Sequence, residues 1–108
     1  TAADLARFLR AVQTGTLLGP ELTNALLTPQ VKHSDRDGWT QYYGHGLWFR
    51  VEPDGTVQHY GKEGINAGVS AYLRHYPAPD LTVVMLSNRE DGVWEPMREI
   101  QRLVVAQS

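Results

Sequence analysis

The chain of 108 residues contains no cysteine, which excludes disulfide bonds and thiolate metal sites. It also lacks any apolar run long enough to cross a bilayer, and no signal-peptide pattern stands at its start. Neither sign of charge is in large excess, because the formal net charge is only −2. Such a charge gives no long-range field toward nucleic acid or an anionic membrane. We therefore expect neither a nucleic-acid partner nor a membrane span.

The length and composition are those of one small globular domain. Chains of this size bury roughly two thirds of their unfolded surface, so the core should be modest. The sequence begins at Thr1 without an initiator methionine. We expect it to be a piece of a longer protein or a processed product.

Three segments have the apolar spacing of helices. The first follows a capping box formed by Thr1 and Asp4 and ends near Thr14. A shorter helix begins at Gly19 and Pro20 and ends at Pro29, since proline suits a first helical turn. The last helix covers about residues 94–106 and has one apolar face.

Strands are predicted between these helices. Residues 43–51 and 56–60 should form a hairpin around a type I turn, and the alternating residues 69–76 should pair antiparallel with the apolar residues 81–86. Residues 31–41 are polar and indicate a surface loop. The predicted fold class is α+β, an antiparallel sheet flanked by N- and C-terminal helices.

Metal ligands are the first chemistry to consider in the polar loop. His33, Asp35 and Asp37 lie close together there, but their spacing matches no standard metal site. Loop composition explains them better, and we expect no metal and no other cofactor.

The glycine-rich residues 60–72 are the most informative stretch. Glycine in a strand leaves room for a ligand or another backbone, so Gly61, Gly64 and Gly68 should clear a path along the strand. Lys62 would place one positive charge beside that path. The strand edge with this lysine could then form one wall of a site for an anionic or carbonyl substrate. The alternative is a glycine-rich hairpin with a surface lysine.

Two further side chains in this region could carry chemistry. His59 precedes the triplet, but no nucleophile is placed beside it by the sequence, so we interpret it as structural. Ser70 lies in half of a nucleophile-elbow pattern, without the closing glycine and without a helix after it. Ser70 is therefore not expected to be a nucleophile.

Three motifs follow one another along the chain: the Lys-x-Gly triplet at 62–64, the small residues and strand at 68–72, and the strand ending in asparagine at 80–88. This ordered set resembles the C-terminal part of the serine β-lactamase and penicillin-binding-protein superfamily, most closely its class C β-lactamase and esterase branch. The opening residues 1–9 and the later residues 27–30 resemble that family too. The likeness covers nearly the whole chain, in order.

The resemblance implies roles for five residues of the triplet strand. Lys62 would point into the cleft, and Ile65 would supply a backbone N–H of the oxyanion hole; these are the expected catalytic residues. Glu63, Gly64 and Asn66 are the expected substrate-binding residues. Glu63 departs from the family's threonine or serine and would repel a substrate carboxylate, which favours neutral esters or amides.

The nucleophile of the family is missing from this chain. The third residue after Ser34, Ser70 or Ser87 is never lysine, and no tyrosine is followed two places later by asparagine. We therefore interpret residues 1–108 as the C-terminal segment of a β-lactamase-like serine hydrolase, inactive alone. Its expected partners are the N-terminal remainder of that hydrolase and a small acyl substrate, and its bare sheet edge should make the isolated chain self-associate.

Two alternatives remain. One is a non-catalytic binding module that keeps the same fold, and the other is an independent interaction domain. The resemblance is compatible with a bacterial protein of either an extracytoplasmic or a cytoplasmic compartment.

Overall fold

The computed structural model describes residues 1–106, which form two helices, six strands and a final helix. Helix α1 spans Ala2–Gln13 and helix α2 spans Pro20–Leu26. The Oγ1 atom of Thr1 accepts a hydrogen bond from the Asp4 N–H at 3.2 Å, and Asp4 reaches back to the cap. The predicted capping box and both helices are thus confirmed.

One antiparallel sheet of six strands follows, and each strand pairs with the next one along the chain. Each connection is short, which favours a meander of hairpins. The strands are β1 (Val31–Asp35), β2 (Thr40–Tyr43), β3 (Trp48–Val51), β4 (Val57–Asn66), β5 (Val69–Tyr76) and β6 (Leu81–Ser87).

The structure corrects the prediction for residues 31–51. The expected polar loop over 31–41 contains β1, a turn and the first two residues of β2, with Asp35 paired to Thr40. The expected strand over 43–51 is interrupted: Tyr43 ends β2, the chain turns at residues 44–47, where Gly46 has a φ of +92°, and only Trp48–Val51 form β3. A glycine adopts this left-handed conformation without the steric cost that a side chain adds.

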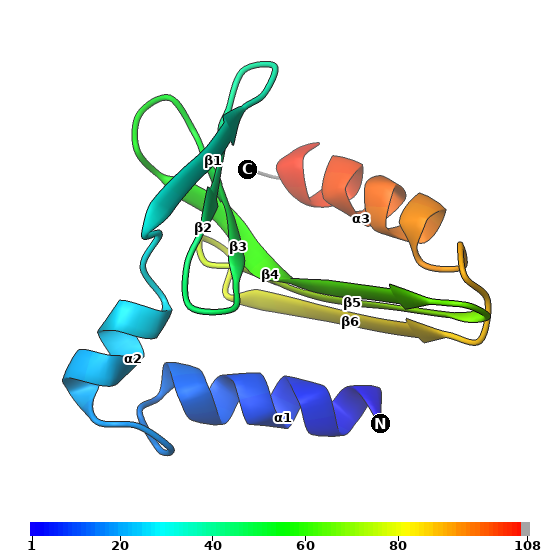
Figure 1. Ribbon diagram of the computed structural model, residues 1–108, viewed down its shortest axis with the longest axis horizontal. Helices are drawn as coiled ribbons and strands as arrows, with labels where there is room; N and C mark the ends of the chain where they lie inside the picture. Colours follow the sequence, from blue (N-terminus) through cyan, green and yellow to red (C-terminus); the bar gives the residue numbers. More distant parts are fainter. Residues whose placement is uncertain (107–108) are drawn as a thin grey trace.

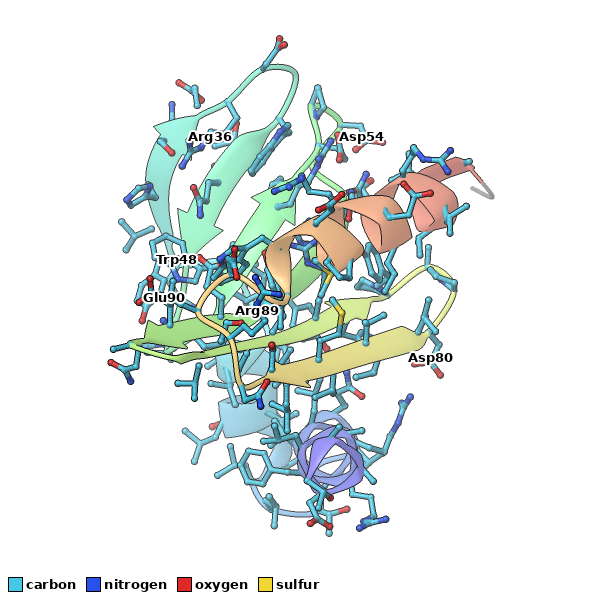
Figure 2. All side chains as sticks on the ribbon, turned by 90° about the vertical axis from the view of Figure 1, so that its right-hand side faces the viewer. Arg36, Trp48, Asp54, Asp80, Arg89 and Glu90 are labelled. Atoms are coloured by element: carbon cyan, nitrogen blue, oxygen red, sulfur yellow. The ribbon has the colours of Figure 1, made fainter. Side chains whose placement is uncertain are left out.

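The helices cover opposite faces of the sheet. In Figure 1, α1 lies on one side of β4, β5 and β6, and α3 (Trp94–Ala106) lies on the other. Figure 2, turned by 90°, shows the same three layers with α1 seen end-on. The α+β architecture with flanking helices is therefore confirmed.

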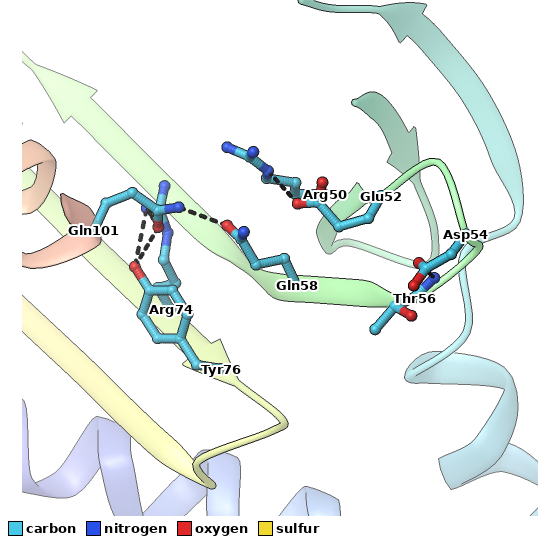
Figure 3. Close-up of polar contacts among 8 residues, drawn as sticks. All are labelled: Arg50, Glu52, Asp54, Thr56, Gln58, Arg74, Tyr76 and Gln101. Carbon is cyan, nitrogen blue, oxygen red and sulfur yellow. Dashed lines mark hydrogen bonds and ion pairs between the residues drawn. The ribbon is translucent and has the colours of Figure 1, made fainter. Parts of the chain in front are cut away.

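The core is small and has a part on each side of the sheet. Leu9 of α1 packs with Phe49 and Tyr60 on one side. On the other, Gln101 of α3 donates to Gln58 at 2.5 Å and accepts from Tyr76 at 2.5 Å, which fastens the helix to β4 and β5 (Figure 3). No helix of the described residues has the length and apolar character to cross a membrane.

Candidate active-site strand

Strand β4 is an inner strand of the sheet for only half of its length. Its pairing with β3 stops at Gly61, opposite Trp48, whereas its pairing with β5 continues to Asn66, opposite Val69. Within the part of the chain that the structure describes, the β3-side edge of β4 is therefore unpaired from Lys62 to Asn66. Alternate residues of such an edge direct free N–H and C=O groups outward.

The five predicted site residues lie together on this edge. Lys62, Glu63, Gly64, Ile65 and Asn66 are consecutive and all exposed, and Ile65 is 55% exposed. Successive side chains of a strand point to opposite faces. Lys62 lines a cavity of about 260 Å³ with Leu5 of α1, whereas Glu63 also lines a larger groove beside α3.

The three glycines of this stretch lie in different structural environments. A Cβ at Gly61 would lie 1.9 Å from the carbonyl oxygen of Leu73, so Gly61 permits close approach of β5. Gly68 has a φ of +79° in the β4–β5 turn. A Cβ added at Gly64 or at Gly68 would have no heavy atom of another residue within 4 Å, its chain neighbours aside. The prediction that the glycines clear a path for a ligand is therefore wrong for Gly61 and stays a prediction for Gly64 and Gly68.

The two charges of the triplet have different surroundings. Among the described residues, none forms an ion pair with Lys62. Glu63 lies opposite Tyr72 in the β4–β5 register. Burial raises the pKa of Tyr72; the Arg74 guanidinium opposes the rise and the Glu63 carboxylate adds to it. Alternation already predicts Tyr72 and Arg74 on one face, but their proximity to Glu63 depends on the register of the two strands, which alternation does not determine.

His59 and Ser70 do not belong to the free edge, although Ser70 lies opposite Ile65 in the β4–β5 register. Burial, and then Arg74 and Arg50, lower the pKa of His59 to about 3, and its ring contacts Tyr76 with centroids 5.5 Å apart. Ser70 is 3% exposed and donates to the Arg89 carbonyl at 2.7 Å. The contacts of both side chains are with neighbouring parts of the fold, which favours a structural role for each.

The acidic and histidine side chains of the β1–β2 hairpin do not gather. Asp35 pairs with Lys32 at 2.8 Å, and the His33 ring contacts Trp48 edge-on. No group of three or more potential metal ligands of these types occurs within residues 1–106.

The meander between two helices, with a Lys-x-Gly triplet on a half-free inner strand, is the architecture of part of a penicillin-binding-protein-like fold. A solved structure with this arrangement is the crystal structure of penicillin binding protein from Bacillus halodurans. Its TM-score is 0.84 at 33% sequence identity, and the match covers 95% of this chain but 30% of that one.

A family model agrees with this structural likeness. The model described as Beta-lactamase matches residues 1–107, and the chain therefore belongs to the Beta-lactamase family. No curated protein matches the chain. The resemblance identified from the triplet and the strands after it is thus confirmed.

Proposed function

We propose that residues 1–108 are the C-terminal segment of a β-lactamase-like serine hydrolase, and that β4 forms one wall of its active site. The observation that carries this proposal is the unpaired edge of β4 from Lys62 to Asn66. An exposed strand edge can pair with an extended acyl substrate through main-chain hydrogen bonds. A lysine without a described ion-pair partner begins that edge.

Each residue of the edge has a proposed role. Lys62 favours the deprotonated form of a nucleophile supplied by the rest of the hydrolase, and the backbone N–H of Ile65 stabilises the developing oxyanion. Gly64 lets the substrate lie against the backbone, and Asn66 binds it further along. Glu63 acts on substrate charge from the other face of the strand, so it gives neutral esters or amides a small advantage over anionic ones.

Exposed apolar side chains support the proposal that this chain is a segment of a larger fold. Phe8 and Leu22 are 58% and 63% exposed, and Ile65 and Leu86 are 55% and 51% exposed. Ile65 and Leu86 line one hollow together, and a contiguous apolar patch on a protein surface usually marks a contact with another surface. The N-terminal remainder of the hydrolase is the expected partner, and the segment alone should show no turnover of chromogenic cephalosporins or aryl esters.

The test is Lys62→Ala in the complete hydrolase. We expect kcat/KM for a short aryl ester to fall at least about tenfold, roughly 1.4 kcal/mol of lost transition-state stabilisation. Lys32→Ala is the matched control, because Lys32 lies in the distant strand β1 and pairs with Asp35. Unchanged kinetics with an intact fold would return Lys62 to the role of a surface lysine.

A second candidate function is a binding module without catalysis. The carboxylate of Glu63, where the family's threonine or serine would stand, favours this alternative. Covalent labelling of the complete protein by an acylating penicillin or fluorophosphonate separates the two, because only the hydrolase carries a reactive serine.

A further inference from the structure

A second concave surface lies beside α3, on the face of the sheet opposite Lys62. This groove has a volume of about 520 Å³, within the range of small-molecule sites. One wall comes from β4 and β5 through Glu63, Tyr72 and Arg74, and the other comes from α3 through Trp94, Arg98 and Arg102. Three arginines and a single carboxylate thus line it.

Arg74 has an unusual environment for a half-buried cation. Its Nη1 donates to Gln101 at 3.1 Å and to the Tyr76 hydroxyl at 3.4 Å, and its Nη2 donates to the Tyr72 hydroxyl (Figure 3 shows the contacts around Gln101). All these acceptors are neutral. No described carboxylate lies within 4 Å of the guanidinium. A partly buried charge is favourable only when it is paired. A ligand anion would therefore supply the negatively charged partner that Arg74 lacks among the described carboxylates.

The helix adds two cations to the same groove. Arg98 and Arg102 are four residues apart, so they project from the same face of α3 on successive turns. Arg102 pairs with Glu99, whereas Arg98 has no ion pair with any residue of the described chain. Like charges at this spacing weaken a helix slightly, and an anion held between them reverses that effect.

Apart from Gln101, the rest of the groove is aromatic and apolar. The rings of Tyr72 and Trp94 meet edge to face with centroids 5.7 Å apart, and Met97 is buried beneath them. The Arg74 guanidinium stacks over the Tyr72 ring at 4.5 Å. A planar ring can pack into such a corner while a charged substituent reaches the arginines.

We propose that this groove binds a small aromatic anion, an aryl phosphate or aryl carboxylate. Its acidic group lies between Arg74 and Arg98, and its ring packs on Tyr72 and Trp94. Arginine suits this task because its planar fork binds such oxyanions in bidentate geometry. The groove shares Glu63 with the free edge of β4, but it lies on the face of the sheet opposite the Lys62 side chain, and the proposal does not depend on the hydrolase proposal.

The experiment is isothermal titration calorimetry of the complete protein with phenyl phosphate, inorganic phosphate and phenol. Phenyl phosphate combines the charge and the ring, so we expect it to bind at least tenfold more tightly than either of the other two. Arg98→Ala should weaken phenyl phosphate binding at least fivefold. Because Arg98 is exposed and forms no ion pair within the described chain, this variant should stay folded, and circular dichroism checks it.

Two controls separate this site from the rest of the molecule. Arg7→Ala removes an exposed arginine from α1 on the other side of the sheet, and Lys62→Ala removes the lysine of the free edge; both should keep the wild-type affinity. Failure of folded protein to bind phenyl phosphate would overturn the proposal. So would equal affinity in Arg98→Ala, or a loss with Lys62→Ala instead. Inorganic phosphate binding as tightly as phenyl phosphate would overturn the aromatic part of the site.

Discussion

Lys62 and Glu63 are adjacent in sequence, yet β4 directs their side chains to opposite faces. Both residues line the cavity beside α1, but only Glu63 also lines the groove beside α3, where its carboxylate lies near Tyr72. A substrate bound on the lysine face would therefore be separated from the carboxylate by the strand itself. This geometry determines how strongly Glu63 can select against anionic substrates.

The first prediction concerns that selection. Across about 10 Å of aqueous surroundings, two unit charges change a binding constant by only about twofold. Glu63→Thr in the complete hydrolase should therefore shift the kcat/KM ratio of a carboxylated ester to its neutral match by about twofold toward the anionic ester. A shift beyond tenfold would mean that the carboxylate contacts the substrate directly.

The glycines give a second prediction, which uses a matched pair. Gly61→Ala places a methyl group against the Leu73 carbonyl, and such overpacking costs about 1–3 kcal/mol of unfolding free energy. Gly64→Ala meets open space, so it should leave the thermal midpoint nearly unchanged while lowering kcat/KM, because the substrate lies against this backbone. Equal midpoints for both variants would show that β4 and β5 relax without cost.

At the scale of whole elements, the sequence predicted the elements with strong periodicity and missed those held by pairing alone. Helices α1 and α3 have clear apolar faces, and β5 alternates; all three were predicted with close boundaries. Strand β1 is exposed at nearly every position, so its side chains have no alternation to reveal it. It is a strand because its backbone pairs with β2, which only the three-dimensional fold provides.

The candidate site, like the fold, was predicted only in part from the sequence. The triplet and its strand could be identified from the residues, but the free edge could not, because it depends on where β3 ends. Glycine spacing suggested one continuous path, whereas close packing of β5 explains Gly61. The arginines beside α3 were not predicted, although the four-residue spacing of Arg98 and Arg102 was a signal in the sequence.

The burial of His59 in β4 leads to a third prediction, on pH. His59 takes up a proton near pH 6.5 when unfolded, but burial lowers its pKa to about 3 in the fold. The unfolded state therefore binds more protons between these values, and acid favours unfolding. By linkage, the free energy of unfolding should fall by about 3 kcal/mol from pH 7 to pH 4 because of this histidine.

His59→Gln isolates this contribution, since glutamine does not titrate. Denaturant unfolding at several pH values should show a shallower loss of stability in the variant between pH 6.5 and pH 4. His75, whose pKa is also lowered by burial, contributes in the same direction in both proteins and so cancels in the comparison. Parallel pH curves would mean that His59 is hydrated in the fold.

For the whole molecule, the arrangement of the sheet leads to the last prediction, that the isolated chain self-associates. Strands β1 and β6 are the outer strands of the sheet, and each presents unpaired N–H and C=O groups within the described chain. Outer edges of this kind pair with other chains unless charges or proline block them. Strand β6 carries no charged residue, and its Leu86 is 51% exposed.

Leu86→Lys tests whether the edge of β6 is the surface responsible. A lysine on an edge strand disfavours edge-to-edge pairing, so this variant should have a larger monomer fraction by light scattering at micromolar to millimolar concentration. Leu103→Lys is the matched control, because Leu103 is 48% exposed but lies on α3, away from any strand edge. If both variants raise the monomer fraction by the same amount, exposed apolar surface in general drives the association, and the edge of β6 is not specifically responsible. A wild-type chain that stays monomeric, with strong hydrogen-exchange protection along β6, would show that this edge needs no partner.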